Sequence, residues 1–229
     1  LFFTEFVNVD GLQIPGREKL LPKLRLTEKE KPIIAQIWGK DPANYYKTVK
    51  DLIIMGYDGV DINMGCPDRA VVKNGCCSAL INNRELAGEI IQATKSAAGS
   101  DVPVSVKTRV GFTTIDLSWI EFLLQQKLNM LTIHARTTKE MSKVPAHYEL
   151  FEQIVALRDK LSPTTLIVAN GDITSRSGGV ALAKKYNLDG VMIGRGVFDD
   201  PYVFAQKSPW LSMAKVQKIN LYKKHLELF

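Results

Sequence analysis

The sequence predicts an α/β fold, a TIM (β/α)8 barrel, and three observations point to it. Short apolar runs alternate with longer segments of helical periodicity along the 229 residues. The runs are apolar throughout, as in parallel strands that are covered on both faces. All but the first run end in polar or ionisable residues, which a barrel gathers at one mouth and an open sheet only near a switch point. The first run also lacks the GxGxxG turn of a dinucleotide-binding sheet, so we favour the barrel.

The strand candidates follow one another at intervals that leave room for a helix. They cover residues 2–7, 33–37, 59–62, 104–107, 131–134, 166–169 and 190–193. The helical segments between them cover residues 44–55, 83–98, 115–126, 148–160 and 177–186. Asp41-Pro42, Asn82-Asn83 and Ser175 are start signals for three of these helices. Parallel strands that are joined in this way require right-handed crossovers.

The number of strands predicts a barrel that lacks its first strand. Seven candidates are one fewer than this barrel needs, and the chain opens without Met inside the apolar run LFFTEF. We therefore expect residues 1–207 to form a barrel without strand 1. After Pro201 the pattern changes, and residues 212–229 carry apolar side chains at near-helical spacing among lysines. We expect residues 208–229 to begin a C-terminal helical domain, although a final barrel helix fits the periodicity equally well.

Composition excludes some classes of protein and leaves others open. The net charge of +6 permits a polyanionic partner without requiring one. Three cysteines, two of them adjacent, cannot form a disulfide scaffold, which favours a reducing cytoplasm. No apolar run reaches the roughly 18 residues of a membrane span, and the first residues do not resemble a signal peptide.

The most informative motif is DGVDINMGCPD, residues 58–68. A buried strand delivers Asn63 and then a Gly-Cys-Pro turn at the barrel mouth, where Cys66 faces the cavity. A free cysteine has a pKa of about 8.5, so its thiol is mostly protonated at neutral pH and can donate a proton as well as attack. The alternative for Cys66 is a small buried side chain, and packing is what we expect for Cys76 and Cys77.

Two further strands end in cationic residues. VSVKTRVG, residues 104–111, places Lys107 and Arg109 on one side of a strand, and LTIHARTT, residues 131–138, does the same with His134 and Arg136. Cations inside a barrel mouth are costly without an anionic partner. Solvated surface charge, and for His134 hydrogen-bonded packing, are the alternatives.

The last two strands predict a phosphate site. IVANGDI, residues 167–173, and VMIGRG, residues 191–196, occupy the positions from which barrels often bind phosphate through backbone N–H groups. Gly171 and Gly194 let the backbone approach a phosphate, and Arg195 adds charge-assisted donors.

Taken together, PIIAQIWG, DINMGCP, PVSVKTRVG, TIHART, VANGDI and VMIGRG closely resemble the motifs of the tRNA-dihydrouridine synthases. The resemblance covers residues 4–204. It implies a flavin-dependent oxidoreductase with FMN in a TIM barrel, followed by a helical domain that binds tRNA. The resemblance further implies that NADPH reduces the flavin, that a hydride passes to C6 of a uracil, and that a cysteine protonates C5. It also implies a cytoplasmic enzyme that acts on tRNA without a metal or a membrane, and the target uridine must be extruded from its stack.

The resemblance assigns roles to particular residues. The catalytic proton donor is Cys66, and the residues that contact the flavin ring and ribityl chain are Gln36, Lys107 and His134. The phosphate contacts are Asn170, Gly171, Asp172, Gly194 and Arg195. The residues at the uracil or the RNA backbone are Asn63, Arg109 and Arg136. Two departures predict weak binding of FMN and tRNA: an Ala-Pro-Met-type first strand is absent, and the helical domain is represented at most by residues 212–229.

Three other functions remain open on the sequence. An FMN barrel that reduces a small pyrimidine or enone would turn over its free substrate without RNA. A phosphate-binding isomerase or aldolase without flavin would use Lys107 as a Schiff-base lysine. A non-catalytic remnant is suggested only by the missing ends.

Overall fold

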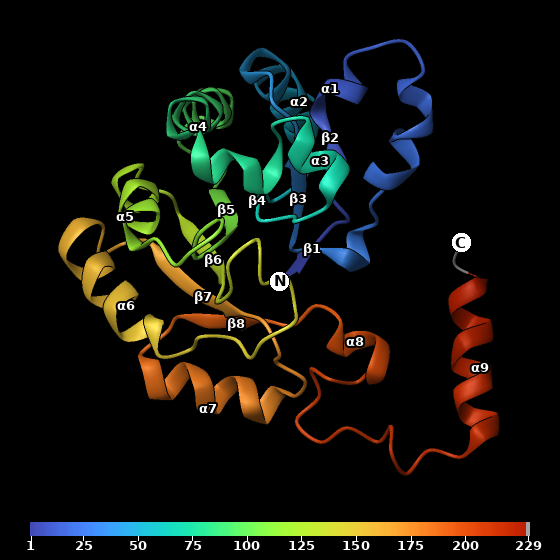
Figure 1. Cartoon of the computed structure of the whole chain (residues 1–229). Coiled ribbons are helices and arrows are strands. Elements are labelled where there is room, and N and C mark those ends of the chain that lie inside the picture. The colour runs from blue at the N-terminus through green and yellow to red at the C-terminus, as the bar shows by residue number, and fades with distance from the viewer. Residues whose placement is uncertain (228–229) are drawn as a thin grey trace.

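The computed structural model describes residues 1–227, in which a curved parallel sheet carries helices on its outer side (Figure 1). The strands are β1 (Phe2–Phe3), β2 (Val7–Asn8), β3 (Ile33–Trp38), β4 (Gly59–Met64), β5 (Val104–Arg109), β6 (Met130–His134), β7 (Leu166–Asn170) and β8 (Gly190–Met192). The α-helices are α1 (Val9–Leu12), α2 (Pro42–Ile54), α3 (Arg69–Lys73), α4 (Arg84–Ala98), α5 (Leu117–Gln125), α6 (Leu150–Leu161), α7 (Arg176–Tyr186), α8 (Gly196–Asp199) and α9 (Lys215–Leu226). The 3-10 helices are η1 (Arg17–Lys19), η2 (Leu21–Leu24), η3 (Glu28–Glu30) and η4 (Cys77–Asn82).

The order of the strands confirms the predicted barrel class. The sheet runs β1-β3-β4-β5-β6-β7-β8, β2 also pairs with β3, and every pairing is parallel. Successive strands therefore lie side by side, as the right-handed crossovers of a barrel require. Helices α2, α4, α5, α6 and α7 follow the outside of the curve (Figure 1). Within residues 1–227 the sheet is open between β8 and β1.

The first predicted strand is interrupted, which corrects the expectation of one continuous strand over residues 2–7. Phe2 pairs with Ile33 but Val7 pairs with Ile37, so the first strand contains one residue more than β3 over the same stretch. Thr4 keeps the bulged segment on the sheet, since its backbone N–H donates to the Ile34 carbonyl at 3.0 Å.

The apolar core accounts for the apolar residues on one face of the strands. Ile37, Ile62, Val106, Leu131 and Ile167 stand in one row of paired residues and have no exposed surface. They belong to the same buried cluster as residues of α2, α4, α5 and α6. Alternate residues of a strand point to opposite faces, so the polar side chains of these strands collect on the face away from the helices.

Helix ends follow their caps more closely than the apolar periodicity. The Asp116 carboxylate accepts from the backbone N–H groups of Ser118 and Trp119, at 3.0 and 3.3 Å, and α5 therefore begins at Leu117 instead of residue 115. Ser175 caps α7, and Asp41 caps α2, as their start signals predict.

The last helix differs from its predicted extent. Helix α9 covers Lys215–Leu226, whereas we expected residues 212–229, of which 228 and 229 lie outside the described residues. None of its residues is buried, and it stands clear of the barrel in Figure 1. The division of the chain at residue 207 stays a prediction. None of the described helices combines the length and the hydropathy that crossing a membrane demands.

Candidate active site at the strand ends

The register of the sheet places most of the predicted strand-end residues on one face. Asn63 pairs with Lys107, Arg109 pairs with His134, and His134 pairs with Asn170. Paired residues of neighbouring parallel strands point to the same side of the sheet. These side chains therefore converge at the C-terminal ends of the strands, on the face opposite the apolar core.

The loop that carries Cys66 is held by two of these side chains. The Asn63 side-chain oxygen accepts from the backbone N–H groups of Gly65 and Cys66, at 3.1 and 3.0 Å. The Arg109 Nε donates to the Gly65 carbonyl at 2.8 Å. A Cβ at Gly65 would lie 3.2 Å from the backbone carbon of Thr108, so the loop approaches β5 too closely for a larger residue. Cys66 is half-buried, in a backbone position that is fixed from both sides.

A chain of buried polar groups continues beneath this loop. The Asn63 amide nitrogen donates to Gln36 Oε1 at 3.0 Å, and Gln36 Nε2 donates to the Asp61 carboxylate at 2.7 Å. Ser105 donates to the other Asp61 oxygen at 2.6 Å. Because a carboxylate can only accept, Asp61 sets the direction of every amide in the chain, ending with the oxygen of Asn63.

Asp61 is the residue of this site that the sequence analysis missed. It has no exposed surface, and burial raises its pKa to about 6, which the hydrogen bonds from Ser105 and Gln36 and the charge of Lys107 oppose. An acidic residue inside the apolar strand GVDINM was the available signal.

Lys107 extends an amine into the same region. Burial lowers its pKa to about 8, the nearby Asp61 carboxylate opposes this shift, and Arg109 adds to it. Its Nζ makes no hydrogen bond or ion pair with any residue in the described range 1–227. An amine in this setting is suited to meet an electron-rich or anionic group.

His134 is a neutral imidazole with a defined tautomer. Burial, with the charges of Arg109, Lys107 and Arg136, lowers its pKa to about 3. Arg136 Nη1 lies 3.1 Å from His134 Nε2, and because a guanidinium can only donate, Nε2 accepts and the proton lies on Nδ1. Arg136 also donates to the Val144 carbonyl at 2.6 Å and pairs with Asp172.

The loops after β7 and β8, which carry the residues predicted to bind phosphate, lie against each other. A Cβ at Gly196 would lie 3.2 Å from the Ile173 carbonyl oxygen. Gly171 has φ +109, and a Cβ there would lie 2.9 Å from the His134 ring, so this glycine lets the backbone pass the imidazole. Gly194 and Arg195 are exposed, with open space where a Cβ would stand at Gly194.

The thiol of Cys66 differs from the ordinary thiol that we expected. A hydrogen bond from the Cys77 thiol lowers the pKa of Cys66 to about 6, against the effect of burial. The backbone of Asp68 and the charge of Arg109 also favour the thiolate, whereas the Asp68 carboxylate opposes it. Cys76 and Cys77 are buried as predicted, and the backbone N–H of Ser78, the residue after Cys77, donates to the Cys66 carbonyl at 3.4 Å.

Arg109 and Arg136 are largely occupied by the protein itself, although we predicted contacts with uracil or RNA. Arg109 Nη1 donates to the carbonyls of Thr137 and Met141, at 3.0 and 2.9 Å. Both guanidinium groups are buried and tie loops together. Sequence alone does not reveal the partners of Arg109, because they are backbone carbonyls of distant segments.

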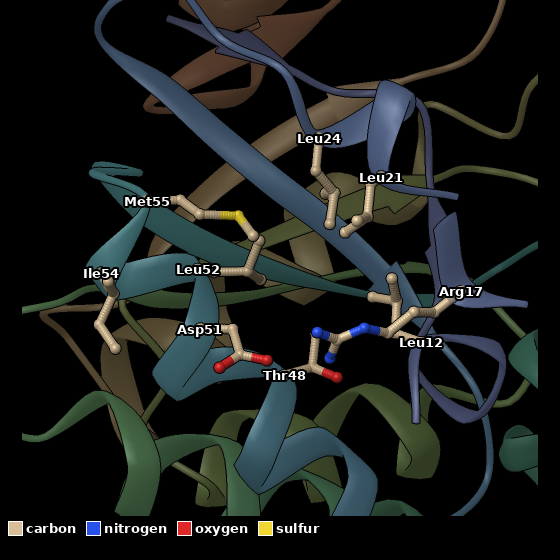
Figure 2. Close-up of a pocket in the computed structure, with 9 residues that line it drawn as sticks. All are labelled: Leu12, Arg17, Leu21, Leu24, Thr48, Asp51, Leu52, Ile54 and Met55. Carbon is tan, nitrogen blue, oxygen red and sulfur yellow. The ribbon is translucent and has the colours of Figure 1, made fainter. Parts of the chain in front are cut away.

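A separate cavity of about 260 Å³ lies on the outside of the barrel, between the segment of α1, η1 and η2 and helix α2 (Figure 2). It is lined by Leu12, Arg17, Leu21, Leu24, Thr48, Asp51, Leu52, Ile54 and Met55. None of the predicted site residues belongs to it. Residues 1–227 contain no group of three or more His, Cys, Asp or Glu side chains that could hold a metal ion.

Comparison with known proteins identifies the family. The family model described as dihydrouridine synthase (Dus) matches residues 1–228. The probable tRNA-dihydrouridine synthase of Staphylococcus aureus (strain COL) is 46% identical over 232 residues, which cover 100% of this chain and 69% of that protein. The probable tRNA-dihydrouridine synthase 2 of Bacillus subtilis (strain 168) is 44% identical over 231 residues, covering 100% of this chain and 70% of that protein.

Solved structures show the same fold at low sequence identity. Histamine dehydrogenase from Rhizobium sp. 4-9 matches with a TM-score of 0.61 and 15% identity, over 88% of this chain and 40% of that one. DHODH from Eimeria tenella, in complex with ferulenol, matches with a TM-score of 0.57 and 14% identity, over 84% of this chain and 63% of that one. These likenesses support the barrel, and the family match goes further: this chain belongs to the dihydrouridine synthase family of enzymes.

Proposed function

We propose that this protein reduces a uridine of tRNA to 5,6-dihydrouridine, with FMN as its redox cofactor and NADPH as the reductant. One observation carries the proposal. In a chain of the dihydrouridine synthase family, the strand ends bring together a held cysteine loop, a half-buried amine that makes no hydrogen bond within residues 1–227, and a neutral imidazole. The cysteine supplies a proton donor, and the amine and the imidazole supply hydrogen-bond donors for a polar ring cofactor.

The donors at the strand ends fit a flat polar ring with a phosphate tail. Lys107 has a free amine, and His134 keeps an N–H at Nδ1 after Nε2 has accepted from Arg136. The open space at Gly194 and the exposed Arg195 guanidinium suit a phosphate. We assign Gln36, Lys107 and His134 to the flavin ring and ribityl chain. We assign Asn170, Gly171, Asp172, Gly194 and Arg195 to the phosphate, with Asn170 and Asp172 acting through their backbones because their side chains are already bonded.

In this proposal the chain's own catalytic step is a proton transfer. When bound, FMN supplies the hydride for C6 of the uracil after reduction by NADPH. Cys66 gives its thiol proton to C5 and becomes a thiolate. Because a hydrogen bond lowers the Cys66 pKa to about 6, Cys66 is a stronger acid than an ordinary thiol, but a smaller fraction of it is protonated at neutral pH. Product formation should therefore fall as the pH rises above this value.

Asn63 and Arg109 position the Cys66 loop in this proposal, and their remaining donors stay candidates for the uracil or the RNA backbone. Asn63 has one amide N–H left, and Arg109 has its Nη2 group. Arg136 contacts His134 and forms an ion pair with Asp172. Its guanidinium is buried and engaged with these partners, which argues against the predicted contact with the uracil or the RNA backbone.

The substrate and the location follow from the same assignment. The net charge of +6 suits a polyanion, and Lys215, Lys223 and Lys224 are exposed on α9. We propose that residues 208–229 begin an RNA-binding helical domain after the barrel of residues 1–207. The target uridine must leave its stack to reach a site inside the barrel mouth. A cytoplasmic location follows from the substrate.

The test is an assay on tRNA transcribed in vitro, which carries no modifications. Protein loaded with FMN should add two hydrogens to one uridine when NADPH is supplied, as detected by mass spectrometry of nucleosides. Cys66→Ala should retain flavin and oxidise NADPH but form no dihydrouridine. Product from free uridine or a small enone, with none from tRNA, would contradict the proposal and favour a small-molecule reductase.

A further inference from the structure

The carboxylate of Asp61 is buried inside the barrel, where packing alone does not require it. It has no exposed surface and pairs with Gln36 and Ser105 on the inner face of the sheet. The apolar core on the other face is built by its neighbours in β4, Val60 and Ile62. A buried charge costs free energy, and well-packed apolar residues of similar volume often stabilise a protein at least as well. The carboxylate therefore calls for a reason other than stability.

Hydrogen bonds connect Asp61 to the backbone of the Cys66 loop in three steps. Gln36 Nε2 donates to Asp61 at 2.7 Å, and the Asn63 amide nitrogen donates to Gln36 Oε1 at 3.0 Å. The Asn63 oxygen then accepts from the backbone N–H groups of Gly65 and Cys66, at 3.1 and 3.0 Å. Gln36 and Asn63 are both buried, so water has little access to replace a lost partner.

The two amides of this chain can stand in only one orientation. The carboxylate at one end only accepts, and the backbone N–H groups at the other end only donate. If Gln36 turned over, its nitrogen would face the nitrogen of Asn63. If Asn63 turned over as well, its nitrogen would face the two backbone N–H groups. The bond to Asp61 is charge-assisted, which is the stronger kind, so losing it frees Gln36 and leaves Asn63 without a fixed partner.

The other side of the loop has its own anchor. Arg109 Nε donates to the Gly65 carbonyl at 2.8 Å, and Arg109 Nη1 is itself fixed by two further carbonyls. Arg109 thus fixes the carbonyl side of the loop, whereas the chain from Asp61 fixes the N–H side. A displacement of about 1 Å at a reacting group can lower a rate by about a hundredfold, so the N–H side matters for a proton donor at Cys66.

We propose that Asp61 is a positioning residue of the proton transfer: through Gln36 and Asn63 it fixes the N–H side of the Cys66 loop, and with it the place from which the thiol meets C5. The inference rests on the proposed function of Cys66. Asp61 exchanges no proton with the substrate, and what counts is an accepting oxygen at this position. Asp61→Asn keeps such an oxygen, whereas Asp61→Leu has a similar shape without one.

Hydrogen exchange of the FMN-loaded protein without tRNA tests the anchoring, with mass spectrometry of the peptides that cover the loop. In Asp61→Leu the N–H groups of Gly65 and Cys66 should exchange about tenfold faster, as expected for a lost hydrogen bond to a charged group. The amides of β6 should keep their protection, whereas general loosening of the fold would expose them too. Asp61→Asn should leave the loop protected. Ser105→Ala is the matched control, because it removes the 2.6 Å hydrogen bond to the other Asp61 oxygen and leaves the chain to the loop intact.

Single-turnover kinetics, followed by the absorbance of the flavin, gives the second readout. Reoxidation of the reduced flavin by saturating tRNA should slow by about 10- to 100-fold in Asp61→Leu, so the loss lies in kcat and not in KM. Reduction of the flavin by NADPH does not use the Cys66 thiol and should slow far less. Asp61→Asn and Ser105→Ala should retain both half-reactions. A residue that only supports the fold would slow the two half-reactions together.

Equal slowing of both half-reactions in Asp61→Leu overturns the inference, and so does unchanged exchange of the loop. A loss in Asp61→Asn as large as that in Asp61→Leu also overturns it, because the accepting oxygen would then not be what counts. If Asp61→Leu does not fold, Asp61→Ala takes its place, and failure of both to fold would assign Asp61 to stability alone. Failure of the proposed function is seen separately, as an unsubstituted protein that forms no dihydrouridine on tRNA although exchange of its loop depends on Asp61.

Discussion

Replacing Asp61 by Asn should remove a pH-dependent loss of stability that the buried carboxylate causes. Asp61 has no exposed surface and accepts hydrogen bonds from Gln36 and Ser105. Asn has the same size, keeps an oxygen for Gln36 and can donate to the Ser105 hydroxyl. The substitution therefore changes the charge while leaving the hydrogen-bonded chain beneath Cys66 connected.

The size of the effect follows from the pKa of Asp61. Burial raises this pKa from 3.8 to about 6, so the folded protein holds the proton more tightly than the unfolded chain. The stability that results is present below pH 3.8 and is lost as the pH rises through about 6. One pKa unit corresponds to about 1.4 kcal/mol, and the whole loss is about 3 kcal/mol.

Urea unfolding of the two proteins at about pH 4.5 and about pH 8 measures this loss directly. Other titrating groups are common to both proteins, so the difference between their free energies of unfolding reports Asp61 together with its charge interaction with Lys107. Between these two conditions the difference should shift in favour of Asp61→Asn by roughly 2 kcal/mol, since part of the loss has already occurred at pH 4.5. A difference that does not change with pH would refute the reasoning about the buried carboxylate.

Three further predictions concern the rest of the site. Gly171→Ala should lower the free energy of unfolding by about 1–3 kcal/mol, because Gly171 has a positive φ and a Cβ there would lie 2.9 Å from the His134 ring. Gly16 has a positive φ but open space around the position of a Cβ, so an equal loss in Gly16→Ala would argue against a role of the contact with His134. Arg195→Ala should raise the FMN dissociation constant about tenfold, as expected for one lost charge-assisted hydrogen bond, and an unaltered constant in flavin titrations would remove Arg195 from the phosphate site. His134 should stay neutral from about pH 5 to 8 because its pKa is about 3, and an NMR titration with a midpoint at the ordinary value would disprove this.

The fold was predictable where a sequence pattern has a single structural cause. Strands that are covered on one face by helices need apolar residues at every second position, and these residues made β3 to β8 readable. The bulge between Phe3 and Val7 was not predictable, since an added residue shows only against the partner strand. The short helices η1 to η4 are too brief to build a periodic pattern.

The candidate site was predictable in its members and less so in their roles. Residues at the ends of barrel strands converge whatever their partners are, so Asn63, Lys107 and His134 could be grouped in advance. Their partners depend on register and loop packing. For this reason the sequence did not show that Asp61 orients the amides or that Arg109 binds backbone carbonyls.

Cys77 illustrates the same limit in a single residue. In the sequence it is one of two adjacent cysteines with a packing role. The structure confirms its burial, ties the next residue, Ser78, to the Cys66 carbonyl, and shows that Cys77 lowers the pKa of the proposed catalytic thiol. Spacing along the chain carries no information about such a contact between a loop and a short helix.

The most direct test of the central claim is the mapping of dihydrouridine in tRNA from cells that lack this protein. At one or more uridine positions dihydrouridine should be lost, restored by the full protein and not restored by Cys66→Ala. Dihydrouridine that persists at every position in the deleted cells would contradict the account.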